Sequence, residues 1–127
     1  MSKYVLDASA ILALLNNEPG SEIVINALSE AVISSINLSE VVAKLADSGM
    51  PEIEIRSAIE TLSLEVINFD PEMAYAAGML RPLTRKAGLS FGDRACLALG
   101  KALSLPVLTS DKAWANLELG IAVHVIR

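Results

Sequence analysis

The sequence predicts an α/β fold in which a parallel β-sheet is covered by helices on both faces. Three observations support this prediction: short apolar runs alternate with amphipathic segments, five such runs recur along 127 residues, and most of them end at a polar residue. Strands that alternate with helices form βαβ units, and such units build parallel sheets that are buried on both faces. We therefore expect four to five parallel strands in a single domain spanning residues 1–127.

The five expected strands are short and rich in the apolar residues that a doubly covered sheet requires. They are residues 4–6, 31–33, 64–67, 106–108 and 121–126. The first four are followed by an acid, a hydroxyl or an amide, namely Asp7, Ser34, Asn68 and Thr109. In an open parallel sheet, ligands bind outside the carboxyl ends of the strands. We therefore expect a functional site at this edge.

Helices are expected between the strands because apolar residues there recur at a spacing of three or four. Residues 10–15 form one apolar helix, and a longer helix begins near Ser90. Pro51 and Pro71 each suit the first turn of a further helix. The apolar positions of the three middle helices are Leu38, Val41, Val42 and Leu45; Ile55, Ile59 and Leu62; and Met73, Ala76, Ala77 and Leu80.

Composition excludes several classes of protein. Apolar residues make up 53% of the chain and charged residues 20%, which is typical of globular rather than disordered proteins. The longest unbroken apolar run, residues 10–15, is far shorter than the about 20 residues of a membrane span, and no signal peptide is evident, so we expect a cytoplasmic protein with no membrane segment. The single cysteine, Cys96, excludes an internal disulfide and a multi-cysteine zinc site, and the single histidine, His124, excludes most His-based metal sites.

Charge is distributed unevenly along the chain. Residues 1–72 contain twelve acidic and three basic residues, whereas residues 73–127 contain seven basic and three acidic ones. The net charge of −5 by itself argues against a nucleic-acid partner, because Lys and Arg neutralise phosphates in such complexes. The basic second half favours a polar binding surface, and chance segregation of surface charge explains the asymmetry equally well.

Four carboxylates are the candidate functional residues, and each also has an ordinary structural interpretation. Asp7, Asp93 and Asp111 stand where helices are expected to begin, and acids there cap or stabilise the helix N-terminus. Gly92 beside Asp93 is an unfavourable residue for a position needed only to start a helix. Glu40 falls on a polar stripe typical of a solvent-exposed helix face. That stripe consists of Asn37, Glu40, Lys44 and Asp47.

If these four acids converge, they cannot all remain ionised at close range without a cation. Carboxylate oxygens without nearby His or Cys favour Mg²⁺ or Mn²⁺ over zinc. A divalent ion beside a basic half of the chain suits phosphodiester hydrolysis, because the ion activates water and neutralises phosphate charge. The residues therefore indicate metal-dependent phosphodiester hydrolysis at the strand ends.

Four segments, in this order, resemble the PIN-domain family and, within it, the VapC-type toxin ribonucleases of bacterial toxin–antitoxin systems. They are YVLDASAILALL, SSINLSEVVAKL, GLSFGDRACLALGKAL and PVLTSDKAW. The resemblance implies a three-layer α/β/α sandwich and an acidic pocket that binds Mg²⁺ or Mn²⁺. It also implies endoribonuclease activity on RNA, a homodimer and an antitoxin protein that blocks the site.

The resemblance also assigns roles to residues. The four acids that match the catalytic positions of the family are Asp7, Glu40, Asp93 and Asp111. Asp7 and Asp93 are expected to contact the metal ion most directly, and the hydroxyls of Ser9 and Thr109 are expected to line the pocket. Basic residues are candidates for contacts to the RNA backbone, on the basis of charge distribution alone. These candidates are Arg85, Lys86, Arg94 and Lys112.

Other functions stay open at this point. A binding-only PIN-like domain with a weak or dead site would share the fold, because fold does not determine function. A receiver-type signalling module is also doubly wound, with Asp70 as its phosphoacceptor, but Asp7 is followed by Ala8 rather than a second acid and the fifth strand lacks a lysine. A phosphatase with an Asp-x-Asp nucleophile is not expected, because Ser9 replaces the second acid.

Overall fold

The computed structural model describes residues 2–127. Its centre is a parallel sheet of five strands, which confirms the expected number. The strands are β1 (Tyr4–Leu6), β2 (Ala31–Ser34), β3 (Glu65–Ile67), β4 (Val107–Thr109) and β5 (Val123–Val125). In space they follow the order β3-β2-β1-β4-β5. Each coincides with one of the five apolar runs to within a few residues at its ends.

The strand order reverses direction between β1 and β4. The chain builds β1, β2 and β3 toward one edge of the sheet and then crosses to β4 and β5 on the other side. Because Leu6 pairs with Leu108, the segments that follow β1 and β4 leave the sheet side by side, at the kind of switch point where open α/β sheets bind ligands. Receiver modules have the strand order 2-1-3-4-5, so this topology contradicts the receiver interpretation.

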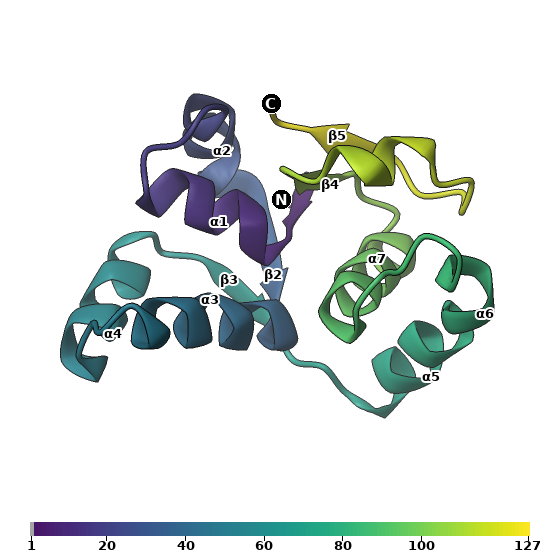
Figure 1. Ribbon diagram of the computed structural model, residues 1–127, viewed down its shortest axis with the longest axis horizontal. Helices are drawn as coiled ribbons and strands as arrows, with labels where there is room; N and C mark the ends of the chain where they lie inside the picture. Colours follow the sequence, from purple (N-terminus) through teal and green to yellow (C-terminus); the bar gives the residue numbers. More distant parts are fainter. Residues whose placement is uncertain (1) are drawn as a thin grey trace.

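Helices cover both faces of the sheet, which confirms the three-layer α/β/α sandwich (Figure 1). One face is covered by α1 (Ala8–Leu15), α2 (Ser21–Ala27), α3 (Ser35–Asp47) and α4 (Glu52–Thr61). The other is covered by α5 (Pro71–Met79), α6 (Arg81–Thr84) and α7 (Phe91–Leu103). Two short 3₁₀ helices, η1 (Leu28–Glu30) and η2 (Lys112–Asn116), complete the structure. No helix within residues 2–127 is long and apolar enough to cross a membrane.

Two hydrophobic cores lie on opposite faces of the sheet, because successive side chains of a strand point to opposite faces. The core under α1 to α4 contains the strand residues Leu6, Ile33 and Leu108. The core under α5 to α7 contains Val5, Val32 and Val107. Seven residues of α7 are buried, and Gly100 lets this helix approach β4 closely, since a Cβ there would lie 2.6 Å from Val107 Cγ2. The central strands and α7 thus form a rigid frame for the pocket described next.

Candidate active site

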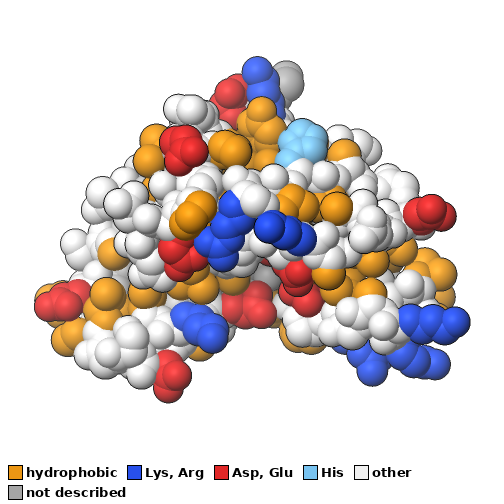
Figure 2. Space-filling model, turned by 45° about the horizontal axis from the view of Figure 1, so that its top comes forward, with side chains coloured by type: hydrophobic (Ala, Val, Ile, Leu, Met, Phe, Trp, Pro, Cys, Tyr) orange, Lys and Arg blue, Asp and Glu red, His pale blue; other side chains and the backbone are white. Residues whose placement is uncertain are grey.

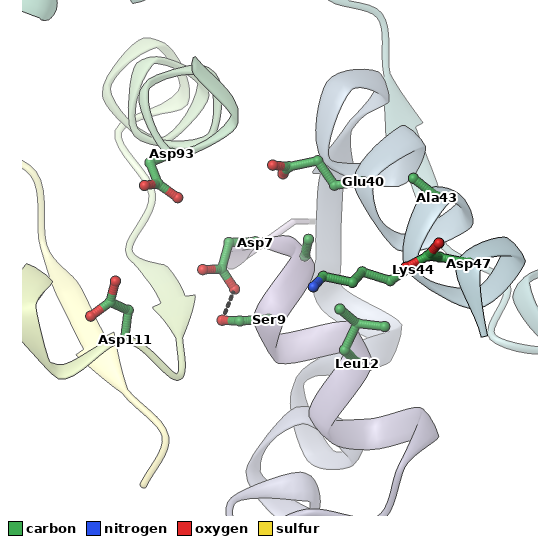
Figure 3. Close-up of a pocket in the computed structure, with 10 residues that line it drawn as sticks. Asp7, Ser9, Leu12, Glu40, Ala43, Lys44, Asp47, Asp93 and Asp111 are labelled. Carbon is green, nitrogen blue, oxygen red and sulfur yellow. Dashed lines mark hydrogen bonds between the residues drawn. The ribbon is translucent and has the colours of Figure 1, made fainter. Parts of the chain in front are cut away.

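A pocket of about 630 Å³ opens at the carboxyl ends of β1 and β4 (Figure 3). Its lining residues are Asp7, Ala8, Ser9, Leu12, Glu40, Ala43, Lys44, Asp47, Asp93 and Asp111. The four acids singled out in the sequence, which span more than one hundred positions, therefore line one pocket. Figure 2 shows acidic side chains gathered in the hollow between the two halves of the molecule, with basic side chains near its rim.

Asp7 is the most deeply held of these acids. It directly follows β1 and caps α1, because its Oδ1 accepts a hydrogen bond from the backbone N–H of Ala10 at 2.9 Å. The Ser9 hydroxyl donates to the same oxygen at 2.7 Å, and the Thr109 hydroxyl donates to Oδ2 at 2.6 Å. The side chain is 5% exposed. These contacts fix the orientation of the carboxylate at the pocket floor.

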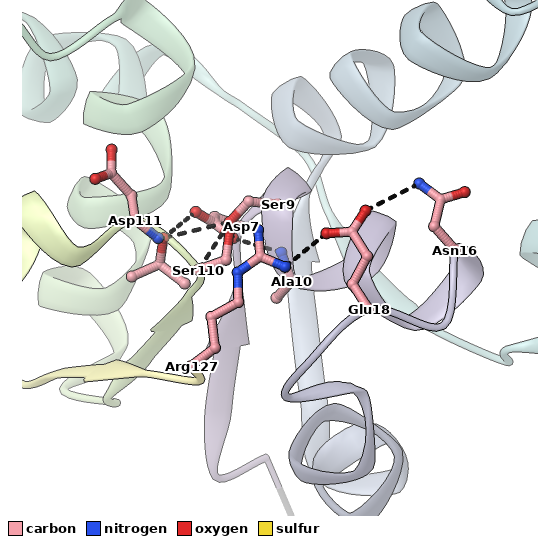
Figure 4. Close-up of polar contacts among 9 residues, drawn as sticks. Asp7, Ser9, Ala10, Asn16, Glu18, Ser110, Asp111 and Arg127 are labelled. Atoms are coloured by element: carbon pink, nitrogen blue, oxygen red, sulfur yellow. Dashed lines mark hydrogen bonds and ion pairs between the residues drawn. The ribbon is translucent and has the colours of Figure 1, made fainter.

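The two predicted hydroxyls have different surroundings. Ser9 lines the pocket, and its Oγ accepts a hydrogen bond from the backbone N–H of Ser110 at 2.9 Å (Figure 4). Thr109 is fully buried, and its Oγ1 accepts from the Asp111 N–H at 3.1 Å while it donates to Asp7. The expectation that the Thr109 hydroxyl lines the pocket is therefore wrong, because the residue is fully buried and is not among the lining residues. It ties the loop after β4 to Asp7.

Burial makes Asp7 a weaker acid than an ordinary aspartate, because it raises the pKa of the carboxyl group. Desolvation raises its pKa from 3.8 to about 6, the nearby charge of Asp93 adds to the shift, and the hydrogen bonds from Thr109, Ser9 and Ala10 oppose it. A carboxyl group with a pKa raised in this way, in a cleft with other acids, is typical of functional sites. Burial also raises the pKa of the Cys96 thiol well above its usual value, so this residue stays protonated and is not a nucleophile.

Glu40 is held by contacts that link α3 to α7. The side-chain amide of Asn37 donates to Glu40 Oε1 at 2.7 Å and to the Gly92 carbonyl at 3.0 Å. A Cβ at position 92 would overlap the Glu40 carboxylate, which explains the glycine in the first turn of α7. Asn37 is 1% exposed, so its placement on a solvent-exposed stripe is wrong. The rest of that stripe, Glu40, Lys44 and Asp47, lines the pocket.

The structural interpretations of Asp93 and Asp111 are correct, and both residues line the pocket as well. Ser90 and Asp93 form a capping box: Ser90 N–H donates to Asp93 Oδ2 at 2.9 Å, and Asp93 N–H donates to Ser90 Oγ at 3.2 Å. Asp111 caps η2 through the N–H of Ala113 at 3.0 Å. A carboxylate has two oxygens and several lone pairs, so capping and facing the pocket are compatible.

The predicted RNA-contacting cations do not line the pocket. The Arg94 guanidinium donates to the Ala77 carbonyl at 3.1 Å and lies 5.8 Å from the Phe91 ring centroid, so it packs against α5 instead. Lys112 is exposed on η2, outside the pocket lining, and Arg85 and Lys86 are exposed beyond α6. Sequence reasoning missed Lys44, which does line the pocket and had been assigned to the solvent face.

The pocket suits a hard divalent cation. Its possible ligands are five carboxylates and a hydroxyl, with no histidine or cysteine in the lining, and such oxygen donors match Mg²⁺ and Mn²⁺. Among residues 2–127, no group of three or more His, Cys, Asp or Glu side chains is close enough to enclose an ion by itself. Mg²⁺ retains several waters and usually binds only one or two carboxylates directly, so the more open arrangement is compatible with it.

Residues 4–119 match the model of the PIN domain. The chain belongs to the PIN-domain family. This match covers most of the chain and confirms the resemblance that the four sequence segments carry. No curated protein matches this PIN domain in sequence.

Solved structures share the architecture. A chain of the DNA-bound VapBC structure from Salmonella typhimurium is similar with a TM-score of 0.78 and 24% identity, over 100% of both chains. A toxin–antitoxin complex from Klebsiella pneumoniae gives 0.76 and 20%, over 98% of both chains. A VapBC structure from nontypeable Haemophilus influenzae gives 0.74 and 21%, over 97% of both chains. At these identities the similarity concerns the fold.

Proposed function

We propose that this PIN domain is a divalent-metal-dependent endoribonuclease that acts in the cytoplasm as the toxin of a toxin–antitoxin pair. The observation that supports this most directly is the pocket at the β1–β4 switch point, which is lined by Asp7, Glu40, Asp93 and Asp111. The PIN family and the toxin–antitoxin complexes among its structural neighbours agree with this function. Its substrate is RNA, and its reaction is hydrolysis of a phosphodiester.

The proposed division of labour is the one that the family resemblance implies. Asp7 and Asp93 would hold Mg²⁺ or Mn²⁺ directly, and both carboxylates are held in place, Asp7 by three hydrogen bonds and Asp93 by its capping box. A divalent ion in this pocket would supply activation of water and neutralisation of phosphate charge. Glu40 and Asp111 orient water molecules from the two sides of the pocket. Asn37 and Gly92 keep Glu40 in position for this task.

The test is metal-dependent cleavage by Asp→Asn variants. Asp7→Asn and Asp93→Asn should each reduce cleavage of single-stranded RNA in Mn²⁺ at least a hundredfold, because each loses the charge that holds the ion. Asn can keep the capping hydrogen bonds, so far-ultraviolet circular dichroism should be unchanged. A chelator should abolish cleavage by the unsubstituted protein.

Asp70→Asn is the matched control. Asp70 caps α5 through the Met73 N–H at 2.9 Å, as Asp7 caps α1, but it does not line the pocket. Its substitution should leave cleavage unchanged. Full activity of Asp7→Asn or Asp93→Asn would contradict the site assignment. RNA binding without cleavage by the unsubstituted protein would instead support the binding-only alternative.

The proposed partners are an antitoxin protein and a second copy of this chain. An apolar groove of about 410 Å³ between α3 and α4 is open to a segment of an antitoxin. It is lined mainly by Leu38, Val42, Ala46, Met50, Ile55 and Ile59. Tyr75, Met79 and Leu83 are 74%, 71% and 67% exposed and are available for a homodimer contact. Sedimentation of the protein, alone and with the product of a neighbouring gene, would test both partners.

A further inference from the structure

We infer that Lys44 forms a phosphate-binding subsite on the wall of the acidic pocket. Its ligand is a backbone phosphate of single-stranded nucleic acid, adjacent to the phosphodiester that is cleaved. The inference rests on the proposed nuclease function and extends it by naming the residue that positions the strand. Lys44 is a positioning residue, because its ammonium would contact a phosphate next to the reacting one.

The first observation is the placement of Lys44. Among residues 2–127 it is the only basic residue that lines the acidic pocket. Figure 3 shows its side chain reaching from α3 toward α1, with the Nζ atom directed to the space beside Asp7 and Ser9. The residue is exposed, so its ammonium is accessible to a ligand and its side chain is not part of a core.

The second observation is that Lys44 forms no ion pair although acids surround it. Glu40 precedes it by four residues on α3, which is the favourable order for a Glu–Lys pair on a helix. The same spacing does produce an ion pair on α4, where Arg56 Nε lies 2.7 Å from Glu52 Oε2. The Glu40 carboxylate is instead held by Asn37. Within residues 2–127, no acidic oxygen lies within 4.0 Å of the Lys44 ammonium.

The third observation is a second cavity that continues from the first. It has a volume of about 370 Å³ and shares Ser9, Leu12 and Lys44 with the acidic pocket. Its other lining residues include Asn16, Ser48, Ser110 and the Arg127–Glu18 ion pair (Figure 4). Lys44 therefore stands at the junction of two cavities. A single-stranded nucleic acid that crosses the acidic pocket can continue past Lys44 into the second cavity.

A phosphate close to the acidic pocket needs a nearby cation, and Lys44 at the junction of the two cavities can supply one. A phosphate that approaches Asp7, Glu40, Asp93 and Asp111 is repelled by their negative charge, and a divalent ion offsets this only at the reacting phosphate. The next phosphate along the strand needs a separate cation, and Arg94 and Lys112 do not line the pocket. Lys acts as a mobile point charge on a flexible stem, which suits contact with a phosphate rather than recognition of a base.

The test measures how binding depends on salt. A short fluorescent single-stranded RNA, and DNA of the same sequence, are titrated with the full chain in Ca²⁺, with the integrity of the nucleic acid checked on a gel. Affinity is followed by anisotropy from about 50 to 200 mM salt, and each lost phosphate contact lowers the slope of log affinity against log salt by about 0.7. The variants are Lys44→Gln, Lys44→Arg and, as a surface control, Lys101→Gln on the far end of α7.

Lys44→Gln should lower the slope by about 0.7 and the affinity roughly three- to tenfold for RNA and DNA alike, while Lys44→Arg restores both and Lys101→Gln changes neither. If the unsubstituted chain cleaves RNA but Lys44→Gln behaves like Lys101→Gln, the subsite is wrong and the nuclease proposal stands. A change confined to RNA would indicate a 2′-hydroxyl contact and overturn the phosphate assignment. Altered Mn²⁺ affinity with an unchanged slope would assign Lys44 to the carboxylates instead. Failure of the unsubstituted chain to bind or cleave RNA would overturn both proposals.

Discussion

Asp7 combines a structural and a chemical task in one side chain. It caps α1, it is buried, and it carries the raised pKa that results from burial. Removing a carboxylate from water disfavours its ionised form, so the folded chain holds this proton more tightly than the unfolded chain does. A bound cation would reverse this preference.

This pKa predicts how stability depends on pH in metal-free protein. The pKa of Asp7 is about 6 in the folded state against 3.8 without burial, so its contribution to stability is complete below pH 4 and is lost as the pH rises through 6. The shift corresponds to about 3 kcal/mol. Asp7→Asn cannot ionise, so between pH 4 and 7 its free energy of unfolding should fall less than that of the unsubstituted protein. Parallel curves from denaturant titrations in a chelator would contradict this prediction.

Gly92 is a second residue with a specific consequence. Gly92→Ala would place a Cβ against the Glu40 carboxylate and displace it from the Asn37 amide. The atoms in the way belong to the flexible end of the Glu40 side chain, so we expect stability to change by less than about 1 kcal/mol, whereas cleavage should fall roughly 10- to 100-fold because misplaced groups at a site are costly. Gly78→Ala on α5 meets no atom within 4 Å and should be neutral or stabilising, with full activity. Thermal melts and cleavage rates of the two variants together check this account.

The sequence indicated the four acids but neither the contacts that hold Glu40 nor the position of Lys44 in the pocket. Acids at strand ends stand out because the topology rule links them to one edge of the sheet. In the sequence, Asn37 and Lys44 both look like members of an exposed helix stripe. Only the packing of α7 against α3 shows that Asn37 is instead a buried contact between the two helices. That contact joins residues 55 positions apart, so no local pattern could reveal it.

At the scale of elements, Asp93 both stabilises the start of α7 and lines the pocket. Its capping box satisfies the backbone N–H groups of Ser90 and Asp93 and fixes the first turn, which carries Gly92 and Asp93. Ser90→Ala removes one half of this box and should cost about 1 kcal/mol in stability. Cleavage should fall much less than in Asp93→Asn, because the carboxylate remains. Equal loss of activity in the two variants would show that helix capping, rather than charge at position 93, controls the site.

Strands and the longer helices follow from the sequence, whereas two short helices do not. The five strands are recognisable because buried parallel strands are short apolar runs between polar residues. In α2, Ile23, Val24 and Ile25 are adjacent, but Val24 is buried while Ile23 and Ile25 are 45% and 55% exposed, which conceals the helical period. The four-residue α6 is too short to show any period. The helical conformation of both segments therefore depends on tertiary packing rather than on a local sequence pattern.

At the scale of the molecule, the sheet order explains how an acidic chain would bind RNA as proposed. The order β3-β2-β1-β4-β5 gathers acids from both halves of the sequence at one switch point, so part of the negative charge is concentrated where a cation can bind. The uneven charge along the sequence does not by itself locate the binding surface: the basic residues of the second half mostly lie outside the pocket, and Lys44 comes from the acidic half.

Divalent ions that bind in the pocket should stabilise the whole fold. Ligand binding to the folded state adds about 2.7 kcal/mol at a concentration one hundred times the dissociation constant. Mn²⁺ should therefore raise the melting temperature of the unsubstituted protein and of Asp70→Asn, but not that of Asp7→Asn. An equal rise in all three proteins would locate the ion elsewhere on the chain.

The most direct test of the central claim is anomalous diffraction from crystals of this protein grown with Mn²⁺. We expect a manganese peak in the pocket, in contact with the carboxylates of Asp7 and Asp93, and no such peak in crystals of Asp93→Asn. Absence of a peak from the pocket at saturating Mn²⁺, or a peak that persists unchanged in Asp93→Asn, would contradict the assignment of this pocket as a metal-dependent nuclease centre.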